Sequence, residues 1–172
     1  MCGILGIANR KTPVFSEIYD GLTMLQHRGQ DASGMVSYDG EFFYERKSNG
    51  LVKDVFSVSD SSTLVGNTGI GHVRYPTAGS LNASEAQPFF VNAPYGIYLI
   101  HNGNLTNTAE QRVKITGKYS RHLRTNSDSE ILLNVLADKI SDSIKANGTD
   151  DPKRNVFEGV AMTMERIEGA YS

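Results

Sequence analysis

Cys2-Gly3-Ile4-Leu5-Gly6-Ile7 stands directly after the initiator methionine. The apolar run over residues 3–9 predicts a short buried strand, and its glycines indicate that a ligand or another backbone comes close. Cys2 is the only cysteine, and removal of Met1 would make it the N-terminal residue. It would then combine a thiol, a soft nucleophile, with an α-amine that acts as a base near neutral pH. A lone cysteine in a strand can equally be a small buried side chain, so the stretch alone leaves both interpretations open.

The composition excludes several classes of protein. The 172 residues suit one domain with a sizeable core, and a net charge of −2 offers no basic surface for nucleic acid or an anionic membrane. No apolar run reaches the length of a membrane span. One cysteine cannot form an intrachain disulfide. The apolar run over residues 2–9 is too short for a signal peptide and has no charged region before it, so we expect a cytoplasmic protein. No histidine or cysteine pair has zinc spacing, so no metal site is expected.

The order of the predicted elements favours an α+β fold, with antiparallel sheet and helices packed outside it. Asp39-Gly40 between two β-prone runs predicts a hairpin. The predicted helices cover residues 16–28 (with Ser16 as N-cap and Gly29 as stop), 51–57, 106–115, a stretch starting with a Ser127–Glu130 capping box, and 155–168 (with an apolar face of Val156, Val160, Met164 and Ile167). Further strands are predicted over residues 69–75, 85–91 and 97–101.

Four polar groups lie where a predicted strand or loop ends. Arg74 carries a rigid fork that suits a carboxylate, although a surface ion pair is the ordinary role of such a residue. Asn102 and Gly103 offer a side-chain and a backbone N–H, which could form an oxyanion hole or a plain turn. Asp128 lies in the first turn of a capped helix, where it could bind an ammonium group or simply stabilise the helix end.

Six segments together resemble the N-terminal-nucleophile glutamine amidotransferases, and within them the glutamine phosphoribosylpyrophosphate amidotransferase branch. They are CGILGI (2–7), LQHRGQDASG (25–34), HVRYPTAGS (72–80), EAQPF (85–89), YGIYLIHNGNL (95–105) and TNSDSE (125–130). The resemblance implies a four-layer αββα sandwich of the N-terminal-nucleophile hydrolase type.

The same resemblance implies a set of roles. Cys2 would be the nucleophile with its own α-amine as base, and Asn102 with Gly103 would form the oxyanion hole. Arg74 and Asp128 would bind the α-carboxylate and α-amino groups of glutamine. Arg28, Gly29 and Thr77 would line the pocket. Ammonia released from glutamine would react with phosphoribosylpyrophosphate to give 5-phosphoribosylamine, the first step of de novo purine synthesis.

The resemblance also implies what the chain lacks. Residues 1–172 match a glutaminase domain that is incomplete at its C-terminal end, and nothing corresponds to the family's phosphoribosyltransferase domain. Phosphoribosylpyrophosphate and Mg²⁺ would bind that absent domain, and the full-length enzyme would be a homo-oligomer. We expect this polypeptide alone to be poorly soluble or inactive. Two alternatives stay open: a glutaminase domain of a glucosamine-6-phosphate synthase-like enzyme, and an inactive fragment that serves as an interaction module.

Overall fold

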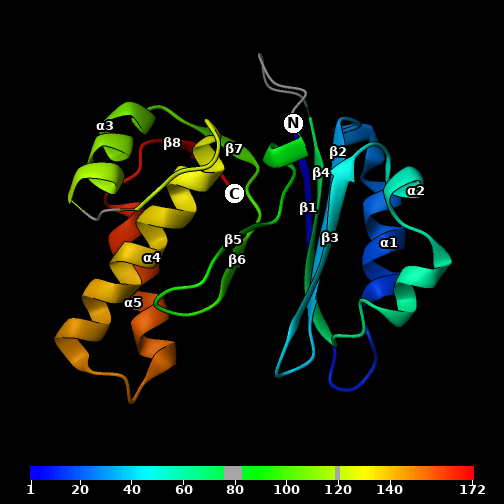
Figure 1. Cartoon of the computed structure of the whole chain (residues 1–172), viewed down its shortest axis with the longest axis horizontal. Coiled ribbons are helices and arrows are strands. Elements are labelled where there is room, and N and C mark those ends of the chain that lie inside the picture. Colours follow the sequence, from blue (N-terminus) through cyan, green and yellow to red (C-terminus); the bar gives the residue numbers. More distant parts are fainter. Residues whose placement is uncertain (76–82, 119–120) are drawn as a thin grey trace. The chain divides into compact units, whose positions relative to one another are not determined.

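The computed structural model describes residues 1–75, 83–118 and 121–172 (Figure 1). The chain forms two compact units. The first contains Met1–Pro88 and Ile100–Asn102, and the second contains Phe89–Leu99 and Gly103–Ser172. Within the described residues, no helix combines the length and the apolar character that crossing a membrane would require. The mixture of helices with antiparallel strands confirms the predicted α+β class.

A four-stranded antiparallel sheet forms the centre of the first unit, in the order β1-β4-β2-β3. Its strands are β1 (Gly3–Ala8), β2 (Ala32–Tyr38), β3 (Phe43–Asn49) and β4 (Thr68–Arg74). Gly3 pairs with Val73 and Ala32 pairs with Arg74, so β1 and β2 begin where β4 ends. This end of the sheet therefore gathers residues from three distant parts of the sequence. The strand β1 is half-buried rather than fully buried, because it lies at the edge of the sheet.

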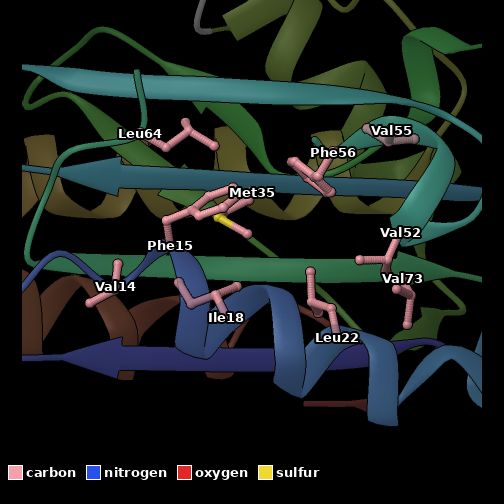
Figure 2. Packing of buried hydrophobic residues seen from close by; sticks show 10 residues of the cluster. All are labelled: Val14, Phe15, Ile18, Leu22, Met35, Val52, Val55, Phe56, Leu64 and Val73. Atoms are coloured by element: carbon pink, nitrogen blue, oxygen red, sulfur yellow. The ribbon is translucent and has the colours of Figure 1, made fainter. Parts of the chain in front are cut away.

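Two helices cover the sheet of the first unit and enclose its core. They are α1 (Phe15–Met24) and α2 (Val52–Val55), and short 3₁₀ turns cover Gln26–Arg28, Val58–Ser62 and Ala83–Glu85. The buried cluster consists of Val14, Phe15, Ile18, Leu22, Met35, Val52, Val55, Phe56, Leu64 and Val73 (Figure 2). It draws on both helices and on β2 and β4, so apolar burial holds the helices against the sheet.

Two local predictions in this unit have different outcomes. The hairpin at Asp39-Gly40 is confirmed, because β2 pairs with β3 and Gly40 adopts a φ of +108°. Ser16 is not the N-cap of the first helix, which starts one residue earlier and takes Val14 as a cap without a side-chain bond. The helix ends at Met24, before the predicted end, and a 3₁₀ turn follows at Gln26–Arg28. Gly29, after that turn, has an extended backbone.

Over its described residues, the second unit contains two strand pairs and three α-helices. The strands β5 (Phe89–Val91) and β6 (Ile97–Leu99) pair with each other, as do β7 (Gly103–Leu105) and β8 (Gly169–Tyr171). The helices are α3 (Thr108–Val113), which continues into a π-helical turn at Lys114–Lys118, α4 (Asp128–Asn147) and α5 (Pro152–Met164). The core cluster comprises Leu105, Ile115, Ile131, Leu132, Val135 and Ile167.

The predicted capping box at the start of α4 is half formed. The Ser127 hydroxyl accepts the N–H of Ser129 at 3.2 Å, so Ser127 is the N-cap. Glu130 instead accepts the backbone N–H groups of Arg124 and Thr125 at 2.8 and 2.7 Å. Its carboxylate therefore secures the loop before the helix rather than the cap residue.

The predicted apolar face of the last helix is wrong for three of its four residues, whereas the fourth, Ile167, lies beyond the end of α5 and is buried in the core. Val156, Val160 and Met164 are all exposed, and α5 buries Asn155, Gly159 and Thr163 instead. A Cβ at Gly159 would lie 2.4 Å from Ile140, so the two helices approach too closely there for a larger side chain. Asn155 accepts a bond from the Ser143 hydroxyl at 2.9 Å, which completes a polar contact between α4 and α5.

Candidate active site at the N-terminal cysteine

Three hydrogen bonds surround Cys2, and each involves a different segment of the first unit. The Cys2 nitrogen donates to Oδ1 of Asn102 at 3.1 Å. The backbone N–H of Tyr75 donates to Cys2 Sγ at 3.4 Å. Nε of Arg28 donates to the Cys2 carbonyl oxygen at 2.8 Å. The half-buried cysteine is therefore fixed at its nitrogen, its sulfur and its carbonyl group.

Two glycines make this arrangement possible. A Cβ at Gly3 would lie 2.7 Å from Val73 and 3.0 Å from Leu25, so β1 begins in tight contact with both β4 and the end of α1. A Cβ at Gly29 would lie 2.4 Å from the Arg74 carbonyl carbon and 2.7 Å from the Tyr75 nitrogen. The glycines after Cys2 are predicted to mark a ligand or another backbone, whereas the closest neighbours of Gly3 are the side chains of Val73 and Leu25.

Asn102 follows a segment that is buried and hydrogen-bonded. Oε1 of Gln87 accepts the His101 N–H at 2.7 Å, and Nε2 of His72 lies 3.2 Å from the His101 carbonyl oxygen. Burial lowers the pKa of His72 to about 4, so its imidazole is neutral near pH 7. Because a carbonyl oxygen only accepts, Nε2 carries the proton of that neutral ring.

Arg74 is paired with two carboxylates. Its Nη1 lies 2.5 Å from Oδ2 of Asp31, and its Nη2 bonds to Oε2 of Glu85. The side chains are only 7%, 6% and 14% exposed, in the order Arg74, Asp31 and Glu85. The guanidinium binds carboxylates of the protein itself, in a buried rather than a surface position, and its role towards the glutamine α-carboxylate stays a prediction.

Two of the predicted site residues belong to the second unit. Gly103 begins β7 opposite Tyr171. Asp128 is the first residue of α4, and its Oδ2 accepts the N–H of Leu105 at 3.0 Å. A carboxylate at this end of a helix is stabilised by the helix dipole. Thr77 lies outside the described residues.

The first unit thus brings Cys2, Arg28, Gly29, Arg74 and Asn102 to one end of its sheet. The structure also reveals contacts around these residues that the sequence did not predict: the Tyr75 N–H on the sulfur, the Asp31 and Glu85 carboxylates on Arg74, and the Gln87 and His72 bonds to His101. All of these residues lie within the motifs quoted above, but no spacing rule assigns them to one another.

The chemistry available at this end of the sheet is nucleophilic. A thiol lies beside a backbone N–H, and an amide oxygen contacts the nitrogen of the same residue. With Oδ1 of Asn102 used as an acceptor, its Nδ2 group is the donor that can face a developing oxyanion. Among the residues that the structure describes, no group of three or more histidine, cysteine, aspartate or glutamate side chains is placed to hold a metal ion.

Comparison with known proteins agrees with this chemistry. Residues 72–149 match a family described as a glutamine amidotransferase domain. The whole chain is 55% identical, over 173 residues, to amidophosphoribosyltransferase of Pasteurella multocida and 54% identical to that of Escherichia coli, and it covers 34% of each. A relative from Saccharomyces cerevisiae is 49% identical over 163 residues, which are 93% of this chain and 32% of that protein. The chain therefore spans about a third of the length of the curated relatives it matches.

Solved structures give the same result. A structure described as the allosteric regulatory enzyme of purine biosynthesis superposes with a TM-score of 0.77 at 30% identity, covering 100% of this chain and 34% of the other. Glutamine phosphoribosylpyrophosphate amidotransferase from Bacillus subtilis, complexed with ADP and GMP, gives a TM-score of 0.75 at 29% identity, covering 99% of this chain and 34% of the other. These neighbours have the N-terminal-nucleophile hydrolase fold, as predicted. The chain therefore carries a glutamine amidotransferase domain match and is similar over its whole length to part of the amidophosphoribosyltransferases.

Proposed function

We propose that the protein to which this chain belongs hydrolyses glutamine to glutamate and ammonia, with Cys2 as the nucleophile after removal of Met1. The observation that carries the proposal is the 3.1 Å bond from the Cys2 nitrogen to Asn102. That nitrogen is an amide joined to Met1 in this structure, and it occupies the place that the free α-amine would take. Met1 is 76% exposed, so a processing enzyme can reach it.

The reaction follows from the groups around the thiol. The α-amine of Cys2 accepts the thiol proton while Sγ forms a bond to the side-chain carbonyl carbon of glutamine. The carbonyl oxygen becomes an oxyanion, which Nδ2 of Asn102 and the backbone N–H of Gly103 are proposed to bind. The protonated amine then returns its proton to the leaving nitrogen, and ammonia departs as the C–N bond breaks. Water, deprotonated by the same amine, attacks the γ-glutamyl thioester and releases glutamate with the thiol restored.

Selection of free glutamine would come from Arg74 and Asp128, as inferred from the sequence. Arg74 would bind the α-carboxylate in competition with Asp31 or Glu85, which hold its guanidinium in the present structure. Arg28 bonds to the Cys2 carbonyl group, so we assign it to holding the nucleophile in place as well as lining the pocket.

The relatives are named amidophosphoribosyltransferases, and we propose the same overall activity for the protein to which this chain belongs. Ammonia would react with phosphoribosylpyrophosphate to give 5-phosphoribosylamine. The chain spans about a third of the relatives' length, so we place the phosphoribosyl-transfer site and its Mg²⁺ in the rest of the protein. The cytoplasmic location and the homo-oligomeric state stay predictions.

The test is covalent labelling with a diazoketone analogue of glutamine, followed by mapping of the modified peptide by mass spectrometry. We expect one adduct, on Cys2, in molecules from which Met1 has been removed. Molecules that retain Met1 should remain unlabelled, because their Cys2 nitrogen is an amide and cannot act as the base.

Cys2→Ser is the matched control, since it keeps the size of the side chain and replaces the thiol by a poorer nucleophile. It should abolish labelling and glutamine hydrolysis without changing the far-UV circular dichroism. An adduct on another residue, or unchanged hydrolysis by Cys2→Ser, would overturn the proposal.

A further inference from the structure

The side-chain amide of Gln87 bonds to both backbone groups of His101, its N–H and its carbonyl oxygen. Oε1 of Gln87 accepts the His101 N–H at 2.7 Å, and Nε2 of Gln87 donates to the His101 carbonyl oxygen at 3.4 Å. Gln87 is 5% exposed and His101 is 2% exposed, so water competes little for these bonds. The carbonyl group belongs to the peptide that joins His101 to Asn102. Its orientation therefore sets where the Asn102 side chain begins.

A second side chain bonds to the same carbonyl oxygen. Nε2 of His72 lies 3.2 Å from it, and His72 is fully buried in β4. In the sheet, His72 pairs with Ile4, two residues after Cys2. The peptide before Asn102 is thus attached directly to the strand that lies beside the nucleophile's own strand.

Gln87 is itself fixed by the far side of the sheet. A Cβ on Gly34 of β2 would lie 1.9 Å from the Gln87 carbonyl oxygen, so the two backbones are in close contact. The next carbonyl, that of Pro88, accepts a bond from Nζ of Lys47 on β3 at 2.5 Å. The backbone at Gln87 and Pro88 is therefore held by two strands, and the Gln87 side chain that extends from it is buried.

We propose that Gln87, assisted by His72, is a positioning residue for glutamine hydrolysis, because together they hold the 101–102 peptide that places Asn102 against the Cys2 nitrogen. The inference rests on the proposed function. Asn102 bonds to the base and offers the donor for the oxyanion, so a displacement of this side chain affects groups that act in the transition state. A misplacement of about 1 Å can lower a rate on the order of 100-fold.

The test compares Gln87→Met with the unaltered protein. Methionine fills the same volume but loses both hydrogen bonds to His101. We expect kcat for glutamine hydrolysis to fall about 10- to 100-fold while KM changes by less than about threefold, because the groups proposed to bind the α-carboxylate and α-amine are elsewhere. The amide proton of His101 should also exchange at least about tenfold faster, a readout that needs no activity.

Gln111→Met is the matched control. Gln111 is 4% exposed and also donates from Nε2 to a backbone carbonyl, that of Arg166 at 3.0 Å, but it lies in the second unit. This variant should lose a similar amount of stability with little change in kcat. Where Gln87→Met does not fold, Gln87→Asn keeps a neutral amide on a side chain one methylene shorter, which no longer reaches both His101 groups and should show the same fall in kcat.

The outcomes separate this inference from the proposed function. Hydrolysis that survives Cys2→Ser would overturn the function itself. Hydrolysis that needs Cys2 but falls no further in the Gln87 variants than in Gln111→Met would overturn the positioning role alone. A loss confined to KM would do the same, because it would place Gln87 in substrate binding.

Discussion

Replacing Arg74 by methionine tests the buried ion triad most directly. Asp31 and Glu85 would then remain as two carboxylates with little access to water, since their side chains are 6% and 14% exposed. A hydrogen bond to a charged group contributes about 1.5–3 kcal/mol, and removing one partner of a buried pair costs about 3–5 kcal/mol. We expect Arg74→Met to lower the free energy of unfolding by about 4 kcal/mol.

The assay is urea unfolding followed by far-UV circular dichroism, which suits a sequence without tryptophan. Adding Asp31→Asn and Glu85→Gln to Arg74→Met removes the unpaired charges and should recover about half of the loss. Arg154→Met is the control, because Arg154 also pairs with a glutamate, Glu158, at 2.8 Å but on an exposed surface. That change should leave the unfolding midpoint almost unaltered.

Two results would refute this reasoning. A loss for Arg74→Met that is no larger than that for Arg154→Met would show that the triad is well solvated in solution. A combined variant as unstable as Arg74→Met alone would show that buried charge is not the cause. KM for glutamine, measured on the combined variant, then reports the substrate-binding role of Arg74 without the contribution of folding.

Three further predictions concern single side chains. Gly29→Ala should lower kcat about tenfold, because the new Cβ displaces the peptide between Arg74 and Tyr75, whose N–H contacts the Cys2 sulfur. Unchanged kcat would argue that this contact does not matter for the reaction. Burial lowers the pKa of His72 to about 4 in the folded protein, so as the pH falls the unfolded chain takes up a proton on His72 before the folded protein does. The neutral imidazole's contribution to the free energy of unfolding is therefore fully present above pH 6.5, and about 3 kcal/mol of it is lost by pH 4. When the free energy of unfolding is measured by urea titration at several pH values in that range, it should change less steeply with pH in His72→Gln than in the unaltered protein. Ser127→Ala should cost about 1 kcal/mol through loss of the N-cap of α4, measured as a shift in the urea midpoint, and no shift would exclude that cap.

Local signals in the sequence predicted much of the fold. The Asp39-Gly40 turn, the strand ending at Arg74 and the long helix after Ser127 depend on neighbouring residues, and all three are present. The face of α5 could not be predicted in this way. Its apolar side chains have helical spacing, but the buried side is chosen by the close approach at Gly159, which only the neighbouring helix imposes.

The site was predictable only where position or motif singled out a residue. Cys2 was singled out because it follows the initiator methionine, and the motifs singled out Asn102, which the structure places in hydrogen-bond contact with the Cys2 nitrogen. The pairing of Arg74 with Asp31 could not be predicted, because the two residues are 43 positions apart and come together only through the register of the sheet. The bonds from Gln87 to His101 depend equally on tertiary structure, so no spacing in the sequence reveals them.

The register of β1 has a practical consequence for anyone producing this protein. The strand pairs with β4 from Gly3 onward, which leaves Cys2 a single residue beyond the first pair. One inserted residue would advance the chain by about 3.3 Å, as far as the whole 3.1 Å bond to Asn102. An affinity tag at the amino terminus would also convert the required amine into an amide. Purification handles therefore belong at the other end of the polypeptide, and an amino-terminal fusion must be cleaved immediately before Cys2.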